Sequence, residues 1–170
     1  MNVFLTGYRA TGKTSVARSI AEQLDMPWFD SDRLIEEAAE MSIADLFALE
    51  SEEGFRDRET AVIRQLAEGE NQIVSLGGGA IVRPENRKIL QGRGMIVWLQ
   101  ASADKIYERL TQDPQTECQR PDLTAQGGID EIRILLQRRQ PWYESVADFF
   151  VNTDDLSPPQ VAARIIQRMG

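Results

Sequence analysis

The chain has 170 residues, of which 42% are hydrophobic and 27% charged, and this composition fits one soluble globular domain with a sizeable core. Its formal net charge of −8 argues against nucleic acid or an anionic membrane as the main partner, because both attract positively charged surfaces. One cysteine and no histidine exclude an internal disulfide, histidine-based catalytic triads and zinc sites of the usual kind.

The sequence shows no sign of export or membrane insertion. Met1 and Asn2 lead straight into an apolar strand pattern, without a basic region or a cleavage site before it. No apolar run approaches the roughly 18 residues of a membrane span. We therefore expect a cytoplasmic protein that needs neither a membrane nor nucleic acid, and we take a monomer as the expected state.

A glycine-bounded loop follows the first predicted strand, residues 2–6, and leads into a predicted helix over 13–25. In this context the pattern G-x-x-x-x-G-K-[ST] marks a phosphate-binding loop, although an ordinary strand-to-helix turn is the alternative. Its glycines let successive amide N–H groups point inward, and the positive end of the following helix faces the same point. Lys13 supplies a cation for the β- and γ-phosphates, and the Thr14 hydroxyl can bind Mg²⁺. The loop therefore predicts binding of ATP with Mg²⁺, through Gly7, Ala10, Thr11, Gly12, Lys13, Thr14 and Ser15.

Two aspartates follow the second predicted strand, residues 27–29. Asp30 and Asp32 are two positions apart, so they lie on the same side if the extended backbone continues. One carboxylate can hold a Mg²⁺-bound water, and the other can accept a hydrogen bond or a proton from a substrate hydroxyl. The alternative is that one of them caps the next helix, which is predicted to run to about Glu40.

The next predicted helices carry an arginine–glutamate pair. Ser42 to Asp45 resembles a capping box that begins a short helix to about Glu50, and a longer helix follows from Gly54. In that longer helix Arg56 precedes Glu59 by three positions, so the carboxylate can fix the guanidinium. Surface pairs of this kind contribute little, and the spacing alone identifies no site.

Three glycines, Gly77 to Gly79, end the third predicted strand, residues 72–76. Three successive residues without side chains indicate close approach by another group. We interpret the segment as a backbone cradle for a small ligand, with a flexible turn as the alternative.

The rest of the chain continues to alternate between strands and helices. We predict strands at 95–99 and 148–151, and helices at 84–91, 102–111, 129–146 (which contains Pro141) and 158–169. Polar residues from 112 to 127 predict a mobile loop. The alternation predicts a three-layer α/β/α P-loop NTPase fold with a five-stranded parallel sheet, as a single domain over residues 1–170. Ligands in such sheets bind beyond the carboxyl ends of the strands.

Taken together, these features resemble the shikimate kinase family over about residues 2–168. The matching features are the phosphate loop at 7–14, Asp30-Ser31-Asp32, Phe55-Arg56 with Glu59, Gly77 to Gly79, Arg120-Pro121, and Arg139-Gln140-Pro141-Trp142-Tyr143 with Val146-Ala147. The resemblance implies transfer of the γ-phosphoryl group of ATP to shikimate, which gives shikimate 3-phosphate in aromatic amino-acid biosynthesis. Two positions depart from the family pattern: Met41 stands where glycine is common, and Asn152 where aspartate is usual.

The resemblance also implies roles for individual residues. Asp32 would hold shikimate hydroxyls and act as the base, and the backbone of Gly78 and Gly79 would contact the ring. Arg56 and Arg139 would bind the carboxylate. Lys13 and Arg120 would be catalytic cations, and Arg120 would lie on a lid at about 112–124. Thr14 would bind Mg²⁺ directly and Asp30 through water, while Glu59 would orient Arg56. Arg109 with Pro158-Pro159 would lie beside adenine, and a helical region at about 31–60 would bind the substrate.

Two other functions remain open from the residues alone. A gluconate kinase-like enzyme would also place aspartate and arginine around a polyhydroxy acid. A regulatory nucleotide-binding domain would keep the phosphate loop, yet it would not need Asp32, Arg56 or Arg139, which are all present.

The role expected of Asp32 gives a first test. Asp32→Asn is expected to abolish turnover while ATP binding is largely kept, because the amide cannot take the hydroxyl proton. Lys13→Ala, by contrast, is expected to abolish turnover by removing a phosphate contact. Steady-state rates measure the turnover of both variants, and ATP titrations measure whether Asp32→Asn keeps ATP binding while Lys13→Ala loses a phosphate contact. A parent rate for Asp32→Asn would contradict the assignment of the base.

Overall fold

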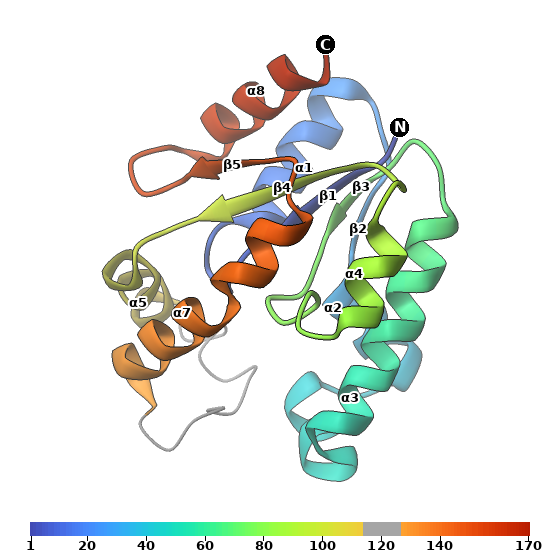
Figure 1. The fold of residues 1–170 in the computed structure, drawn as a ribbon, viewed down its shortest axis with the longest axis vertical. Coiled ribbons are helices and arrows are strands. Elements are labelled where there is room, and N and C mark those ends of the chain that lie inside the picture. The colour runs from blue at the N-terminus through green and yellow to red at the C-terminus, as the bar shows by residue number, and fades with distance from the viewer. Residues whose placement is uncertain (114–126) are drawn as a thin grey trace.

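The computed structural model describes residues 1–113 and 127–170. Its strands are β1 (Val3–Thr6), β2 (Trp28–Asp30), β3 (Ile73–Ser75), β4 (Met95–Gln100) and β5 (Phe149–Asn152). Its helices are α1 (Lys13–Leu24), α2 (Ser31–Ala39), α3 (Ile43–Glu68), α4 (Pro84–Leu90), α5 (Ala103–Gln112), α7 (Gly128–Val146) and α8 (Pro158–Met169). Figure 1 shows the strands at the centre with the helices packed around them.

The five strands form one parallel sheet in the order β2-β3-β1-β4-β5, which confirms the predicted fold class. Val3 of β1 aligns with Ile73 of β3 on one side and with Met95 of β4 on the other. The strand order changes direction at β1, so the loop after β1 lies between the ends of its two neighbours. That loop is the predicted phosphate loop.

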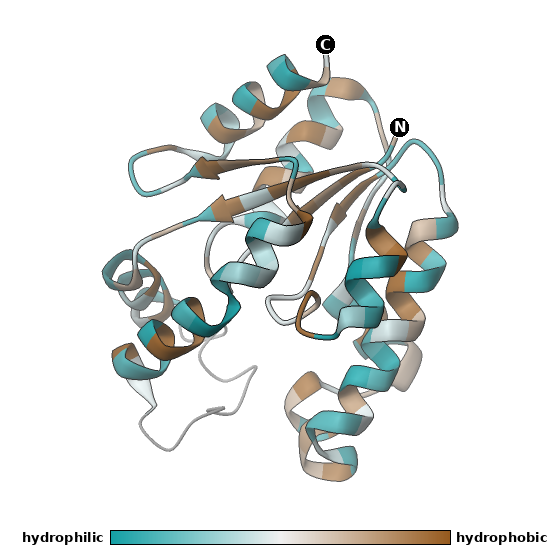
Figure 2. Ribbon diagram, in the orientation of Figure 1, coloured by the Kyte–Doolittle hydropathy of each residue, from teal (hydrophilic) through white to brown (hydrophobic). Residues whose placement is uncertain are grey.

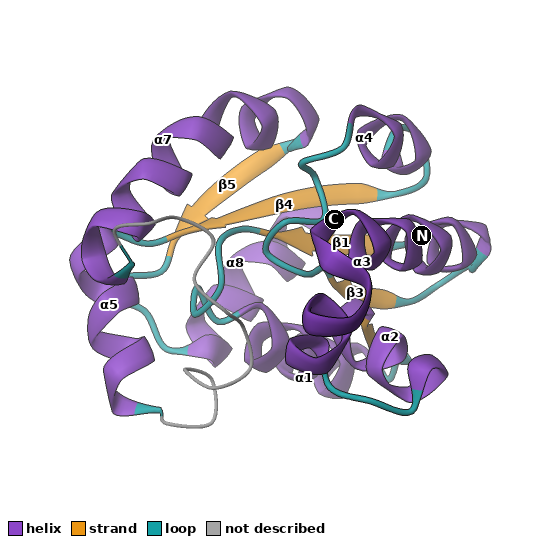
Figure 3. Cartoon of the chain, turned by 90° about the horizontal axis from the view of Figure 1, so that it is seen from below, coloured by secondary structure: helices purple, strands orange, loops and turns teal. Residues whose placement is uncertain are grey.

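Successive residues of the strands enter different cores, which explains why the strands are almost continuously apolar. Val3 and Leu5 pack in a cluster with α1 and α8, whereas Phe4 packs on the opposite face with α3, α4 and α7. Figure 2 shows the hydrophobic strands between these helices, and Figure 3 shows α4 and α7 on one side of the sheet with α1 and α8 on the other. The sheet is therefore held rigidly, and the residues at its carboxyl edge have fixed positions.

Helix α3 covers both of the helices predicted for residues 42–68. The helical backbone is interrupted at Ser51, which has φ 65° and ψ 178°, three positions before the predicted start at Gly54. Ser42 caps the helix, because its side chain accepts a hydrogen bond from the Asp45 N–H at 3.1 Å. The break reorients the second part of α3, which carries Arg56 and Glu59.

The predicted lid at 112–124 and Arg120 lie outside the described residues, apart from Gln112 and Asp113. Within the described parts of the chain, no helix is both long and apolar enough to cross a membrane.

Candidate active site

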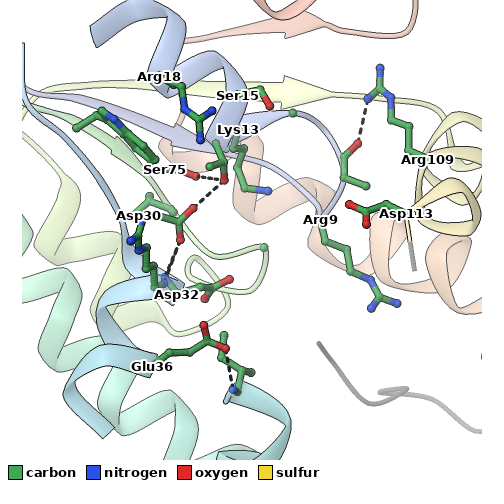
Figure 4. A pocket seen from close by; sticks show the side chains of 18 residues that line it. Arg9, Lys13, Ser15, Arg18, Asp30, Asp32, Glu36, Ser75, Arg109 and Asp113 are labelled. Atoms are coloured by element: carbon green, nitrogen blue, oxygen red, sulfur yellow. Dashed lines mark hydrogen bonds between the residues drawn. The ribbon is translucent and has the colours of Figure 1, made fainter. Parts of the chain in front are cut away.

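A cavity of about 630 Å³ opens at the carboxyl edge of the sheet. Its walls come from the phosphate loop, the end of β2, the first turns of α1 and α2, and the segment after β3 (Figure 4). The lining includes nine of the predicted site residues, seven of which are Ala10, Gly12, Lys13, Thr14, Ser15, Asp30 and Asp32. Gly78 and Arg109 also line it.

The phosphate loop turns through backbone angles that favour glycine. Gly7 has φ 145° and Gly12 has φ 91°, and a Cβ atom on Gly7 would overlap the carbonyl oxygen of Leu99 in β4. Ala10 also has a positive φ, 60°, a conformation that costs a residue with a side chain some energy. The loop is thus packed tightly against the sheet, with the α1 N-terminus directed at the cavity.

Hydrogen bonds within the loop fix its shape. The buried Lys13 Nζ donates to the carbonyl oxygens of Gly7 at 2.8 Å and Tyr8 at 2.7 Å. The Thr11 hydroxyl donates to the same Tyr8 oxygen at 2.8 Å. The Lys13 ammonium therefore lies along the inner side of the loop, where it faces the centre that the amide groups surround.

Asp30 uses its two carboxylate oxygens for two purposes. Oδ1 accepts hydrogen bonds from the backbone N–H groups of Asp32 at 3.0 Å and Arg33 at 3.3 Å, which caps α2. Oδ2 accepts a hydrogen bond from the Thr14 hydroxyl at 2.7 Å, and this hydroxyl also lies 3.3 Å from Ser75 Oγ. The capping alternative is thus correct for one oxygen, while the other oxygen meets the phosphate loop.

The reason given for pairing Asp30 with Asp32 was wrong. Helix α2 begins at Ser31, so the backbone does not stay extended between the two aspartates. Both carboxylates nevertheless line the same cavity, because α2 starts at the edge of the sheet and turns its first residues inward (Figure 4).

The first of the three glycines after β3 is held by α2. The N–H of Gly77 donates to Ser31 Oγ at 2.9 Å, and Ser31 is fully buried. A Cβ atom at Gly77 would lie 2.5 Å from Asp32 Oδ1. Glycine is therefore required here so that the Asp32 carboxylate can lie against the backbone.

The next two glycines bring both predicted substrate arginines to the same segment. The carbonyl oxygen of Gly78 accepts hydrogen bonds from Arg139 Nη1 at 3.2 Å and from the Tyr143 hydroxyl at 2.8 Å. A Cβ atom at Gly79 would overlap the guanidinium of Arg56. Gly78 and Gly79 lie in a turn that is buried, and the groups that approach Gly77 and Gly79 closely are side chains of this chain.

Arg56 and Glu59 form a buried ion pair, which agrees with Glu59 orienting Arg56 and not with the alternative of an ordinary surface pair. Arg56 Nη1 lies 2.7 Å from Glu59 Oε1, and the two side chains are only 6% and 0% exposed. Glu52, which is half exposed, is a second partner of Arg56 at 3.5 Å. The break at Ser51 turns this face of α3 toward the end of β3, which the local sequence pattern did not show.

Arg109 donates hydrogen bonds to two segments, the phosphate loop and the residue after β5. Nη1 donates to the carbonyl oxygen of Ala10 at 3.0 Å, and Nη2 donates to the carbonyl oxygen of Thr153, after β5, at 3.0 Å. It therefore lies between the phosphate loop and the end of β5. Arg120, its predicted companion at the nucleotide, lies outside the described residues.

Sequence reasoning missed several residues around the site. Tyr8, within the phosphate loop, is 2% exposed, and the guanidinium carbons of Arg9 and Arg139 lie 5.9 and 5.7 Å from its ring centre. Burial raises the pKa of the Tyr8 phenol, while the two arginines act in the opposite direction. Glu131, at the start of α7, is also buried. Only the position of Tyr8 inside the motif could have indicated it, since its partners are distant in sequence.

A phosphate loop between β1 and α1, with carboxylates and arginines at the ends of the adjacent strands, defines a P-loop phosphotransferase. The shikimate kinase family model matches residues 9–170. The chain is 40% identical over 169 residues to the shikimate kinase of Symbiobacterium thermophilum, covering 99% of this chain and 96% of the relative. It is 37% identical to that of Rhodopirellula baltica, covering 98% and 89%.

A solved structure has the same fold over almost the whole chain. The shikimate kinase from Acinetobacter baumannii, in complex with shikimate, superposes with a TM-score of 0.92 at 34% identity, covering 99% of this chain and 92% of that one. The chain therefore belongs to the shikimate kinase family, whose members are ATP-dependent phosphotransferases.

The contact between Gly79 and Arg56 can be tested directly. Gly79→Ala is expected to raise the KM for shikimate at least about tenfold, because the methyl group displaces the guanidinium and weakens a charged contact. The KM for ATP is expected to stay within about twofold. Gly92→Ala is a control for loss of stability alone, since φ 72° at Gly92 strains a side chain while no atom lies within 4 Å of an added Cβ. Equal increases in both KM values would contradict a local effect on Arg56.

Proposed function

We propose that this protein binds ATP at the phosphate loop and shikimate beside the Gly77–Gly79 segment, and transfers the γ-phosphoryl group to a shikimate hydroxyl, giving shikimate 3-phosphate. The observation that carries the proposal is the gathering of Asp32, Arg56 and Arg139 around these glycines, beside the phosphate loop. The shikimate present in the Acinetobacter baumannii relative supports the same acceptor. The product belongs to the chorismate and aromatic amino-acid pathway.

The acid end of the substrate is assigned to Arg56 and Arg139. Both are 5% exposed, so a carboxylate between them would meet two largely desolvated guanidinium groups. Each charged hydrogen bond to such a carboxylate contributes about 1.5–3 kcal/mol. Glu59 fixes Arg56 by the 2.7 Å ion pair, and the Gly78 carbonyl fixes Arg139, so neither side chain needs to be ordered by the substrate.

The alcohol end is assigned to Asp32. Its carboxylate lies against the backbone of Gly77 and lines the cavity that also contains Lys13. A hydroxyl held by Asp32 would face the phosphate loop, and the carboxylate would accept its proton as the new P–O bond forms. The backbone of Gly78 and Gly79 is proposed to contact the shikimate ring.

The triphosphate is assigned to the loop from Gly7 to Ser15. Lys13 would exchange its two carbonyl partners for phosphate oxygens, while the N–H groups of residues 10–15 bind the remaining oxygens. Thr14 Oγ1 and Asp30 Oδ2, 2.7 Å apart, are hard oxygen donors that fit Mg²⁺, with Thr14 binding directly and Asp30 through water. When bound, Mg²⁺ would neutralise charge on the β- and γ-phosphates. Arg109 is assigned to the adenine side, and a cytoplasmic monomer is part of the proposal.

The acceptor is tested by measuring ADP release in a coupled assay with shikimate and gluconate side by side. We expect acid-dependent ADP release with shikimate and little with gluconate, together with formation of shikimate 3-phosphate. A preference for gluconate would contradict the acceptor assignment. Tight ATP binding without turnover on either acid would contradict catalysis altogether.

The role of Arg139 is tested by Arg139→Ala with Arg138→Ala as its control. Arg138 is the neighbouring residue on α7 and is exposed, whereas Arg139 is buried at Gly78. Arg139→Ala is expected to raise the shikimate KM by about tenfold or more and to leave the ATP KM nearly unchanged, and Arg138→Ala is expected to change neither. Equal effects of Arg139→Ala on both substrates would assign it to the nucleotide side instead.

A further inference from the structure

Arg9 is a second cation of the phosphate loop, and the roles proposed above do not include it. It lies between Tyr8 and Ala10, in the centre of the loop, and its side chain is 20% exposed. It lines the same cavity as Lys13, Thr14 and Asp32. Figure 4 shows its side chain extending from the loop into the cavity.

Arg9 lies farther from its carboxylate partner, Glu131, than Arg56 lies from Glu59. Its Nη2 atom lies 4.0 Å from Oε2 of Glu131, a carboxylate that is 1% exposed, whereas Arg56 and Glu59 are 2.7 Å apart. A distance of 4.0 Å exceeds a direct hydrogen bond. The Glu131 carboxylate therefore directs the guanidinium of Arg9 electrostatically without binding it closely.

The ring of Tyr8 contacts both Arg9 and Arg139, the second of which is assigned to the substrate carboxylate. Its buried ring lies 5.9 Å from the guanidinium carbon of Arg9 and 5.7 Å from that of Arg139. Both distances are within the range of a cation–π contact. Arg139 also donates to Gly78, so one aromatic ring connects an arginine of the phosphate loop with an arginine of the acid site.

We propose that Arg9 is a catalytic residue that contacts the γ-phosphoryl group during transfer, with Glu131 and Tyr8 as the residues that position it. This inference rests on the proposed phosphoryl transfer. Negative charge in that transition state is spread over three equatorial oxygens, which a single ammonium cannot meet on all sides. The planar guanidinium suits two of these oxygens, and a group positioned in advance needs no reorganisation when the charge develops.

The step itself balances without a covalent role for Arg9. The bond between the γ-phosphorus and the β–γ bridging oxygen breaks, and its electrons stay on ADP. A new bond forms between the phosphorus and the shikimate oxygen, whose proton passes to Asp32. Arg9 contributes only positive charge and hydrogen bonds to the oxygens of the moving group.

The first test uses nucleotide binding, which does not depend on the acceptor. Titrations with ADP and with adenylyl imidodiphosphate, both with MgCl₂, measure how much the γ-phosphate contributes to affinity. For Arg9→Met we expect an unchanged affinity for ADP. The ratio of the affinity for adenylyl imidodiphosphate to the affinity for ADP is expected to fall about tenfold, about 1.4 kcal/mol. Arg64→Met is the control, because Arg64 forms an exposed pair with Glu85 at 2.7 Å, away from the cavity. An unchanged preference in Arg9→Met would overturn the proposal, whatever the acceptor is.

The second test uses turnover. Arg9→Met is expected to lower kcat by roughly 10²-fold, as loss of one charge-stabilising donor does, and to change the shikimate KM less than about threefold. Arg9→Lys is expected to recover part of kcat because it keeps the charge. Glu131→Gln, which keeps the guanidinium, is expected to lower kcat by several fold only. If Arg9→Met and Glu131→Gln lose kcat to the same extent and thermal stability to the same extent, the two residues form a purely structural pair and the proposal is overturned.

Discussion

The close packing of side chains against the backbone of Gly77, Gly78 and Gly79 is the constraint on which the site depends. Residues with a Cβ atom would overlap Arg56 at Gly79 and crowd Asp32 at Gly77. The carbonyl of Gly78 holds Arg139 and Tyr143 from α7. One short segment at the end of β3 thus brings together groups from α2, α3 and α7 that are far apart in the sequence.

The charges around this segment explain its preference for an anion. Arg56 and Arg139 are two buried cations, and Glu59 is the buried carboxylate that pairs with the first of them. Burying a charge costs several kcal/mol unless partners compensate for it, and Arg139 donates its hydrogen bond to the neutral carbonyl of Gly78, so an anion beside Arg139 would be stabilised. The chain as a whole carries a net charge of −8, so the positive charge of these two buried arginines is a local feature of the Gly77–Gly79 segment.

The sequence predicted the fold and most of the site because their signals are local. The strand pattern of residues 2–6, the phosphate-loop motif and the three glycines each identify an element within a few residues. The burial of the Arg56–Glu59 pair was not predictable in this way, since it depends on the break at Ser51 and on packing against β3.

Two other features could not be predicted from the sequence: the contacts between residues far apart in the chain, and the position at which α2 starts. Tyr8 and Arg9 meet Arg139 and Glu131, which lie more than a hundred positions along the chain, and no pattern in one sequence reports such a contact. The pairing of Asp30 with Asp32 was inferred from extended spacing, although the helix begins between them. Both residues line the cavity, but through a geometry that differs from the one inferred.

Because the Asp30 side chain is shared between Thr14 and the first turn of α2, the two substrate sites are mechanically joined. A displacement of this carboxylate toward the nucleotide would strain its hydrogen bonds to the N–H groups of Asp32 and Arg33, which begin α2. Thermodynamic reciprocity then requires that the acid alter the affinity for nucleotide by the same factor as the nucleotide alters the affinity for the acid. One carboxylate thus contacts both the phosphate loop and the helix that carries Asp32.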